Sequence, residues 1–167
     1  MTDQLALDEA AGCPGGHRAL LDVFVPGRPA PQGSKRHVGK GIMIEMSKHV
    51  APWRTDIREA VIAARKAYHA ATIASFTAGA PAAGPMLVRL EFVMPRPAGT
   101  PKRRTPAAVK RPDCDKLARA VLDAVGSAGC VWVDDSQVVD LHATKRIAEP
   151  GEAPGCRITI HTPASQP

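Results

Sequence analysis

Two short acidic runs hold the residues of this sequence that are best suited to chemistry. The first reads R-P-D-C-D over residues 111–115, and the second reads V-D-D-S-Q over residues 133–137. Carboxylates that converge repel one another, and a divalent cation is the natural way to compensate their charge. Ligand sets made only of oxygen suit Mg²⁺, with Mn²⁺ as a substitute, better than Zn²⁺. The pattern predicts a metal site that contains Asp113, Asp115 and the pair Asp134–Asp135.

Such a site is typical of phosphoryl-transfer chemistry. Mg²⁺ takes few protein carboxylates, keeps several waters and meets substrate phosphates. One or two ions would orient a water, lower its pKa and stabilise charge on the phosphate and on the leaving oxygen. The alternative is structural, because Asp is common at helix N-caps and in turns. On that interpretation Asp113 caps a helix and Asp134–Asp135 form a turn.

The backbone around the first acidic run is expected to direct two carboxylates to one side. Pro112 disfavours a helical conformation at Arg111, so Asp113 should emerge from extended backbone. Alternate side chains share a face in extended backbone, and we therefore expect Asp113 and Asp115 to point the same way. A helix expected over 115–125 would then be a single crossover that returns the second acidic run to the first.

Cations surround the two acidic runs. Arg119 lies one helical turn after Asp115 on the same face, and two roles stay open for it: an ion pair with Asp115, or stabilisation of the scissile phosphate in the transition state. The segment 95–111 is long, irregular and basic, and a loop of this length is usually functional or disordered. A polyanionic substrate would require such cations. The candidate DNA contacts are Lys35, Arg36, Lys102, Arg103, Arg104, Lys110, Arg111, Lys116, Lys145 and Arg146.

Hydrophobic periodicity predicts a small α+β fold, in which a mixed sheet of about four strands packs with two main helices. The strands are expected over 20–25, 86–94, 130–133, 138–144 and 157–161, and the helices over 47–74 and 115–125. Trp53 lies on the apolar stripe of the first helix, which favours a core position over base stacking. Arg65 is assigned to the solvent-facing side of the same helix. Residues 26–41 are rich in Pro, Gly and cations and are expected to form a loop, which either is merely solvated or contacts the DNA backbone.

Length and composition indicate a single domain over 19–162, with a flexible leader over 1–18 and a tail over 163–167. The 22 Lys and Arg residues exceed the 16 Asp and Glu residues, and the net charge of +6 favours an anionic partner. The cysteines are scattered without the spacing of a zinc finger. No apolar run is long enough to span a membrane, and the N-terminus does not have the pattern of a signal peptide. We expect a cytoplasmic protein without a small-molecule cofactor.

The acidic runs and the residues between them resemble the RusA family of Holliday-junction resolvases, found in bacteria and their phages. The specific part reads R-P-D-C-D-K-L-A-R-A-V-L-D-A and then V-W-V-D-D-S-Q-V-V-D-L, within a resemblance that covers residues 20–162. The family has a D-x-D-N-L-x-K motif, then a helix ending in L-D-A, then a hydrophobic-Asp-Asp-x-Gln-Val segment. Two linked motifs at a matching separation are far more specific than a lone D-x-D.

This resemblance implies a RusA-like fold and a homodimer that acts on four-way DNA junctions in recombination and repair. The implied activity is a magnesium-dependent, structure-selective endonuclease that makes symmetric nicks. The implied metal ligands are Asp113, Asp115 and Asp135, with Asp134 as an accessory. The family's Lys falls at Arg119, which keeps a cation for clamping phosphate but puts proton donation at this position in doubt. The family's Asn falls at Lys116, which is a second departure.

Three alternatives stay open. The protein could be a phage-type nuclease of the same fold that cuts flaps, forks or other branched DNA. It could also bind junctions with little catalysis, because of the exchange at Arg119. Finally, it could be a basic structural protein whose aspartates serve only as caps and turns.

Overall fold

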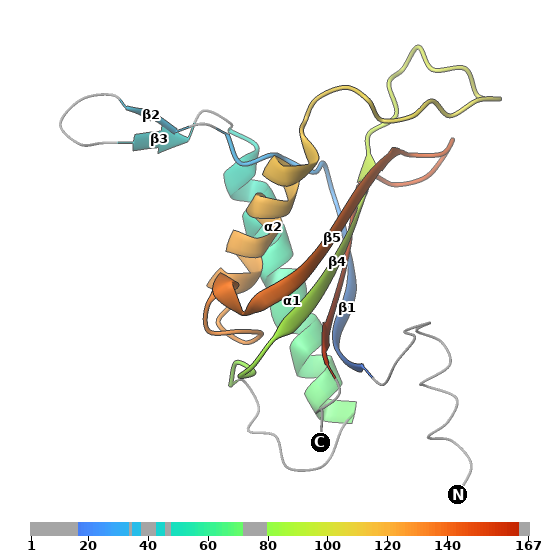
Figure 1. The fold of residues 1–167 in the computed structure, drawn as a ribbon. Coiled ribbons are helices and arrows are strands. Elements are labelled where there is room, and N and C mark those ends of the chain that lie inside the picture. The colour runs from blue at the N-terminus through green and yellow to red at the C-terminus, as the bar shows by residue number, and fades with distance from the viewer. Residues whose placement is uncertain (1–16, 34, 38–42, 46–47, 72–79, 164–167) are drawn as a thin grey trace, which may run out of the picture.

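The computed structural model describes residues 17–33, 35–37, 43–45, 48–71 and 80–163, and these form one sheet, a small hairpin and two long helices. The sheet has the strand order β1-β6-β4-β5, in which β4 and β5 are parallel and the other neighbours are antiparallel. Its strands are β1 (Arg18–Pro26), β4 (Met86–Met94), β5 (Val138–Ile147) and β6 (Gly155–Thr162). Helices α1 (Val50–Ala71) and α2 (Cys114–Ser127) lie on the same side of this sheet (Figure 1). The predicted α+β fold with a mixed four-stranded sheet and two main helices is confirmed.

The core lies between the sheet and the helices. Strand β4 alternates as expected, with Val88, Leu90 and Phe92 buried while Arg89 and Glu91 are exposed. From the helices, the buried side chains include Trp53, Ile57 and Val61 of α1 and Leu117, Val121 and Val125 of α2. Trp53 is only 2% exposed, so the predicted core position is confirmed. Within the described residues, no helix is long and apolar enough to cross a membrane.

The predicted loop over residues 26–41 is partly wrong. A short antiparallel hairpin pairs β2 (Lys35–His37) with β3 (Met43–Glu45). Three-residue strands are too short to show an alternating pattern, and the cations and glycines around them favour a loop on composition alone. The side chains of Lys35 and Arg36 lie outside the part of the chain that is described, so their proposed contacts with DNA stay predictions.

The strand predicted over residues 130–133 is also wrong. Only a single parallel bridge, between Ala82 and Trp132, forms at this place in the described residues. Val131 and Trp132 are buried in the core, so the apolar run reflects burial and not a ladder of strand pairs. The run is followed by a short 3-10 helix, η1 (Asp135–Gln137), which leads directly into β5.

Arg65 does not lie on the solvent-facing side of α1, as was predicted, but is buried and only 2% exposed. Its Nε donates to the carbonyl of Cys130 at 3.0 Å, and its Nη1 donates to the carbonyl of Leu20 at 3.3 Å. These bonds tie α1 to β1 and to the segment after α2. Hydrogen bonds of this kind are what a buried guanidinium requires, and burial lowers the pKa of Arg65 from its ordinary value.

The predicted domain boundaries at residues 19 and 162 stay predictions, because the leader and the tail lie largely outside the described residues. Strand β1 begins at Arg18, one residue inside the predicted leader. Residues 1–16 of that leader and residues 164–167 of the predicted tail lie outside the described residues.

Candidate active site

One face of α2 carries the candidate catalytic residues into a cavity of about 620 Å³. Asp115, Arg119 and Asp123 recur every four residues, a spacing that places side chains one above the other on a helix. All three line this cavity, and Asp135 and Leu141 line it from η1 and β5. The structure therefore brings Asp115, Arg119 and Asp135 together around one space. We call this space the acidic cavity.

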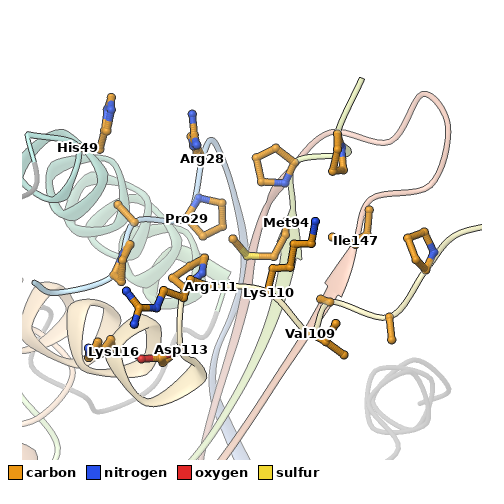
Figure 2. Close-up of a pocket in the computed structure, with 18 of the residues that line it drawn as sticks. Arg28, Pro29, His49, Met94, Val109, Lys110, Arg111, Asp113, Lys116 and Ile147 are labelled. Atoms are coloured by element: carbon orange, nitrogen blue, oxygen red, sulfur yellow. Dashed lines mark ion pairs between the residues drawn. The ribbon is translucent and has the colours of Figure 1, made fainter. Parts of the chain in front are cut away.

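Asp113 lies beside the acidic cavity but does not line it. Helix α2 begins at Cys114, so Asp113 is the N-cap residue, with extended φ and ψ of −74° and 143°. Asp115 is already helical, and the prediction that the two carboxylates share a face of extended backbone is therefore wrong. Asp113 lines a second cavity instead, with Lys116, whose Nζ lies 3.4 Å from the carboxylate (Figure 2).

The side chain of Asp113 does not cap the helix, although the residue occupies the capping position. The structural interpretation of this aspartate therefore lacks the hydrogen bond that would support it. Its ion pair with Lys116 joins two half-exposed side chains, and such pairs contribute little to stability. The carboxylate of Asp113 stays accessible for a ligand.

Asp135 is held in place by a buried tryptophan. Nε1 of Trp132 donates to Oδ1 of Asp135 at 2.8 Å, and Trp132 is only 1% exposed. Gly126 of α2 allows this arrangement, because a Cβ there would lie 3.1 Å from the same Oδ1. The close approach of η1 to α2 thus leaves little room for a side chain at residue 126. The carboxylate of Asp135 that Trp132 holds is itself exposed to solvent.

Asp134 has a structural role in the turn. Its carboxylate accepts from the backbone N–H of Ser136 at 2.8 Å, within a capping box that includes Gln137. Hydrogen bonding by the Ser136 side chain, together with that from its backbone N–H, lowers the pKa of Asp134. The Gln137 side chain in turn donates to the carbonyls of Ala82 and Gly84. The turn interpretation thus applies to Asp134, which does not line the acidic cavity, and its accessory role toward a metal stays a prediction.

The carboxylates suit a hard divalent cation in chemistry, since every donor is an oxygen. They do not form a closed ligand shell: in the described part of the chain, no group of three Asp, Glu, His or Cys side chains is placed to hold a metal ion. Asp115 and Asp135 share a cavity, and Asp113 lies across Lys116 from them. The three carboxylates would have to approach one another to share one ion.

Lys145 and Arg146, which were predicted to contact DNA, both have partners within the protein. Nζ of Lys145 donates to the carbonyls of Lys110 and Pro112, at 2.9 Å and 2.7 Å. Arg146 makes two hydrogen bonds to the Glu152 carboxylate, at 2.6 Å and 2.5 Å. Lys145 therefore fixes the backbone that leads into Asp113, and contact of either cation with DNA stays a prediction.

Arg96 organises the basic loop over residues 95–111. Its guanidinium donates to the Thr105 hydroxyl and to the backbone carbonyls of Pro101, Arg104 and Ala148, over distances of 2.7–3.0 Å. A hub of this kind supplies the loop with internal order that its composition did not predict. The predicted DNA contacts Lys102, Arg103, Arg104, Lys110 and Arg111 are all exposed on this loop.

Two residues of the site were missed from the sequence. Asp123 lines the acidic cavity and lies 3.7 Å from Arg54 of α1, and its four-residue spacing from Arg119 could have identified it. Gln32 lines both cavities, and its Oε1 is buried with no hydrogen-bond partner in the described residues. No signal in the sequence distinguishes Gln32 from an ordinary loop residue.

Comparison with known proteins identifies a family for this chain. The family model for Endodeoxyribonuclease RusA matches residues 26–161, which is most of the chain and includes every residue of the acidic cavity. The comparison with curated proteins finds no match. The chain belongs to the RusA family of endodeoxyribonucleases.

Proposed function

We propose that the protein is a structure-selective endonuclease that resolves four-way DNA junctions with the help of Mg²⁺. The observation that carries this proposal is the convergence of Asp115, Arg119 and Asp135 on one cavity, beside exposed cations. Carboxylates suit a metal that meets phosphate, and cations suit the polyanionic backbone on either side of it. Membership of the family adds that the phosphodiester bonds of DNA are the substrate.

The proposed reaction gives different roles to the aspartates and to Arg119. Asp113, Asp115 and Asp135 would hold the cation, which supplies Lewis acidity and lowers the pKa of a water when it is bound. Arg119 lies on the α2 face of the acidic cavity, where its guanidinium can clamp a phosphate with two parallel hydrogen bonds. Its role is electrostatic and not that of a proton donor, since an arginine stays charged at any physiological pH.

Two copies of the chain would act on one junction. A four-way junction is pseudo-twofold symmetric, so a homodimer can present one acidic cavity to each of two opposed strands. Nicks at both positions, with 5′-phosphate and 3′-hydroxyl ends, separate the junction into two duplexes. This is the reaction that recombination and repair require, and we propose that it takes place in the bacterial cytoplasm, where the DNA is.

The decisive experiment compares Asp115→Asn with the wild type on a synthetic four-way junction in Mg²⁺. Cleavage should fall by at least about a hundredfold, because a metal ligand is lost, while junction binding without metal persists. Asp140→Asn is the matched control, because Asp140 is exposed on β5 and lines neither cavity. Undiminished cleavage by Asp115→Asn would refute the mechanism. Parallel assays with forks, flaps and linear duplex decide between junction resolution and a broader activity on branched DNA.

A further inference from the structure

A second cavity, of about 930 Å³, adjoins the acidic cavity. It lies between the segment 28–33 after β1, the basic loop and the start of α2 (Figure 2). The volume is near the upper end of the range for small-molecule sites. Gln32, Gly33 and Lys116 line both cavities, so a DNA strand that occupies one would extend into the other. We call it the proline cavity.

The walls of the proline cavity are apolar and rigid. Six of its lining residues are Pro29, Pro31, Pro95, Pro97, Pro106 and Pro112. Met94 and Ile147, from the ends of β4 and β5, add further apolar surface. Proline fixes its own backbone angle φ, so such walls lose little conformational freedom when a ligand binds. The cavity is therefore prepared for an apolar group.

The rim of the proline cavity is cationic. In Figure 2 the cation Arg28 projects on one side of it, Lys110 extends from the basic loop near Met94, and Arg111 points toward Lys116 and Asp113. Lys116 adds a further cation next to Asp113. An apolar interior with a cationic rim is complementary to a nucleotide, whose base has apolar faces and whose phosphates are anionic.

We propose that the proline cavity binds an unstacked nucleotide that flanks the scissile phosphate. This inference rests on the proposed nuclease function and adds the form of DNA that the enzyme selects. Bases in an intact duplex are stacked on their neighbours, so their faces cannot contact the cavity walls. Unstacking is least costly where a base is already unpaired. The cavity would thereby favour branch points over uniform duplex.

Gln32 gives the proline cavity a polar group that can accept a hydrogen bond from a base. Its Oε1 is buried and has no hydrogen-bond partner in the described residues, which costs free energy in the unliganded protein. Each unpaired base carries a donor for such an oxygen: an exocyclic amino group in adenine, cytosine and guanine, and the imide N–H in thymine. The oxygen therefore favours an unpaired base, whose donors are free, without selecting among the four bases.

The test uses a four-way junction with 2-aminopurine at the branch point and the full-length protein in EDTA, so that binding is observed without cleavage. Binding should raise the 2-aminopurine fluorescence, because the base leaves the stack. Ala108→Leu fills the cavity from a half-buried lining position and should weaken binding of this junction by about tenfold. Ala98→Leu is the matched control, because Ala98 lies on the same loop and does not line the cavity. If Ala108→Leu does not fold, Ala107→Leu replaces it from an exposed lining position.

Two results would overturn the inference. One is a wild-type complex in which the 2-aminopurine fluorescence equals that of free DNA. The base would then remain stacked, and the cations around the cavity would contact only the phosphate backbone of paired DNA. The other is an equal effect of the lining and control variants. Failure of the nuclease proposal has a different signature, since the wild type would then raise the fluorescence in EDTA but cut no junction in Mg²⁺ or Mn²⁺.

Discussion

The ammonium of Lys145 in β5 donates to the carbonyl of Pro112, at 2.7 Å, directly before Asp113. A second bond reaches the carbonyl of Lys110 at 2.9 Å. Cys114 strengthens the same connection, because its Sγ lies 3.5 Å from the carbonyl of Ala143 in β5. The sheet thus positions the start of α2, and with it the first acidic run, through one strand.

Replacing Lys145 with Gln should lower the kcat for junction cleavage by about 10–100-fold, because the backbone before Asp113 loses its anchor and a small misplacement is costly in catalysis. The KM should change little. If Lys145 contacted a DNA phosphate instead, the plot of the logarithm of the binding constant against the logarithm of the salt concentration would become less steep by about one unit of slope. Lys66→Gln, an exposed change on α1, is the control and should alter neither quantity. A lower salt slope with unchanged kcat would contradict the positioning role.

Replacing Trp132 with Phe removes the donor that fixes Asp135 but keeps an aromatic ring in the core. Partners that orient a metal ligand typically contribute 10–100-fold to metal affinity. The Mg²⁺ concentration that gives half-maximal cleavage should therefore rise by about that factor, with little change in rate at saturating Mg²⁺. An unchanged Mg²⁺ dependence would show that the indole N–H does not position the carboxylate.

Replacing Arg65 with Met should lower the free energy of unfolding by about 2–4 kcal/mol, because the carbonyls of Leu20 and Cys130 lose their buried donors. Arg58→Met is the matched control on the same helix, since Arg58 is exposed and its Nε donates to the carbonyl of Ser127 at 3.3 Å. That change should cost less than about 0.5 kcal/mol. Urea unfolding measures the free energy of unfolding of both variants, and the comparison requires that their m-values are unchanged. Equal losses for the two variants would contradict the prediction.

Most of the fold could be predicted because its main strands and helices carry strong periodic patterns. Strand β4 alternates clearly from Met86 to Met94, and the stripe on α1 has the four-residue spacing of a helix. The predicted solvent-facing position of Arg65 was wrong. This arginine continues the spacing of Trp53, Ile57 and Val61, yet it was assigned to solvent from its charge and not from its position.

The proximity of the candidate residues could be predicted better than their geometry, and their roles stay predictions. The two acidic runs indicated Asp115 and the pair Asp134–Asp135, helical spacing indicated Arg119, and the family resemblance singled out Asp135. The structure gathers Asp115, Arg119 and Asp135 around one cavity. The position of Asp113 depends on whether α2 begins at residue 114 or 115, and helix ends are poorly determined by propensity. The proline cavity depends on segments far apart in the chain, and no local pattern predicts such a contact.

Mg²⁺ should stabilise the wild type against heat, because a ligand that binds only the folded state raises the free energy of unfolding. At ten times its dissociation constant the ion would contribute about 1.4 kcal/mol and raise the Tm by about 3–5 °C. Asp135→Asn should abolish most of this shift. Asp134→Asn should keep it, because Asn is also a good cap and the carboxylate of Asp134 is engaged by Ser136. Differential scanning fluorimetry with and without Mg²⁺ measures all three proteins. The reverse pattern, in which only Asp134→Asn loses the shift, would transfer the ligand role from Asp135 to its neighbour.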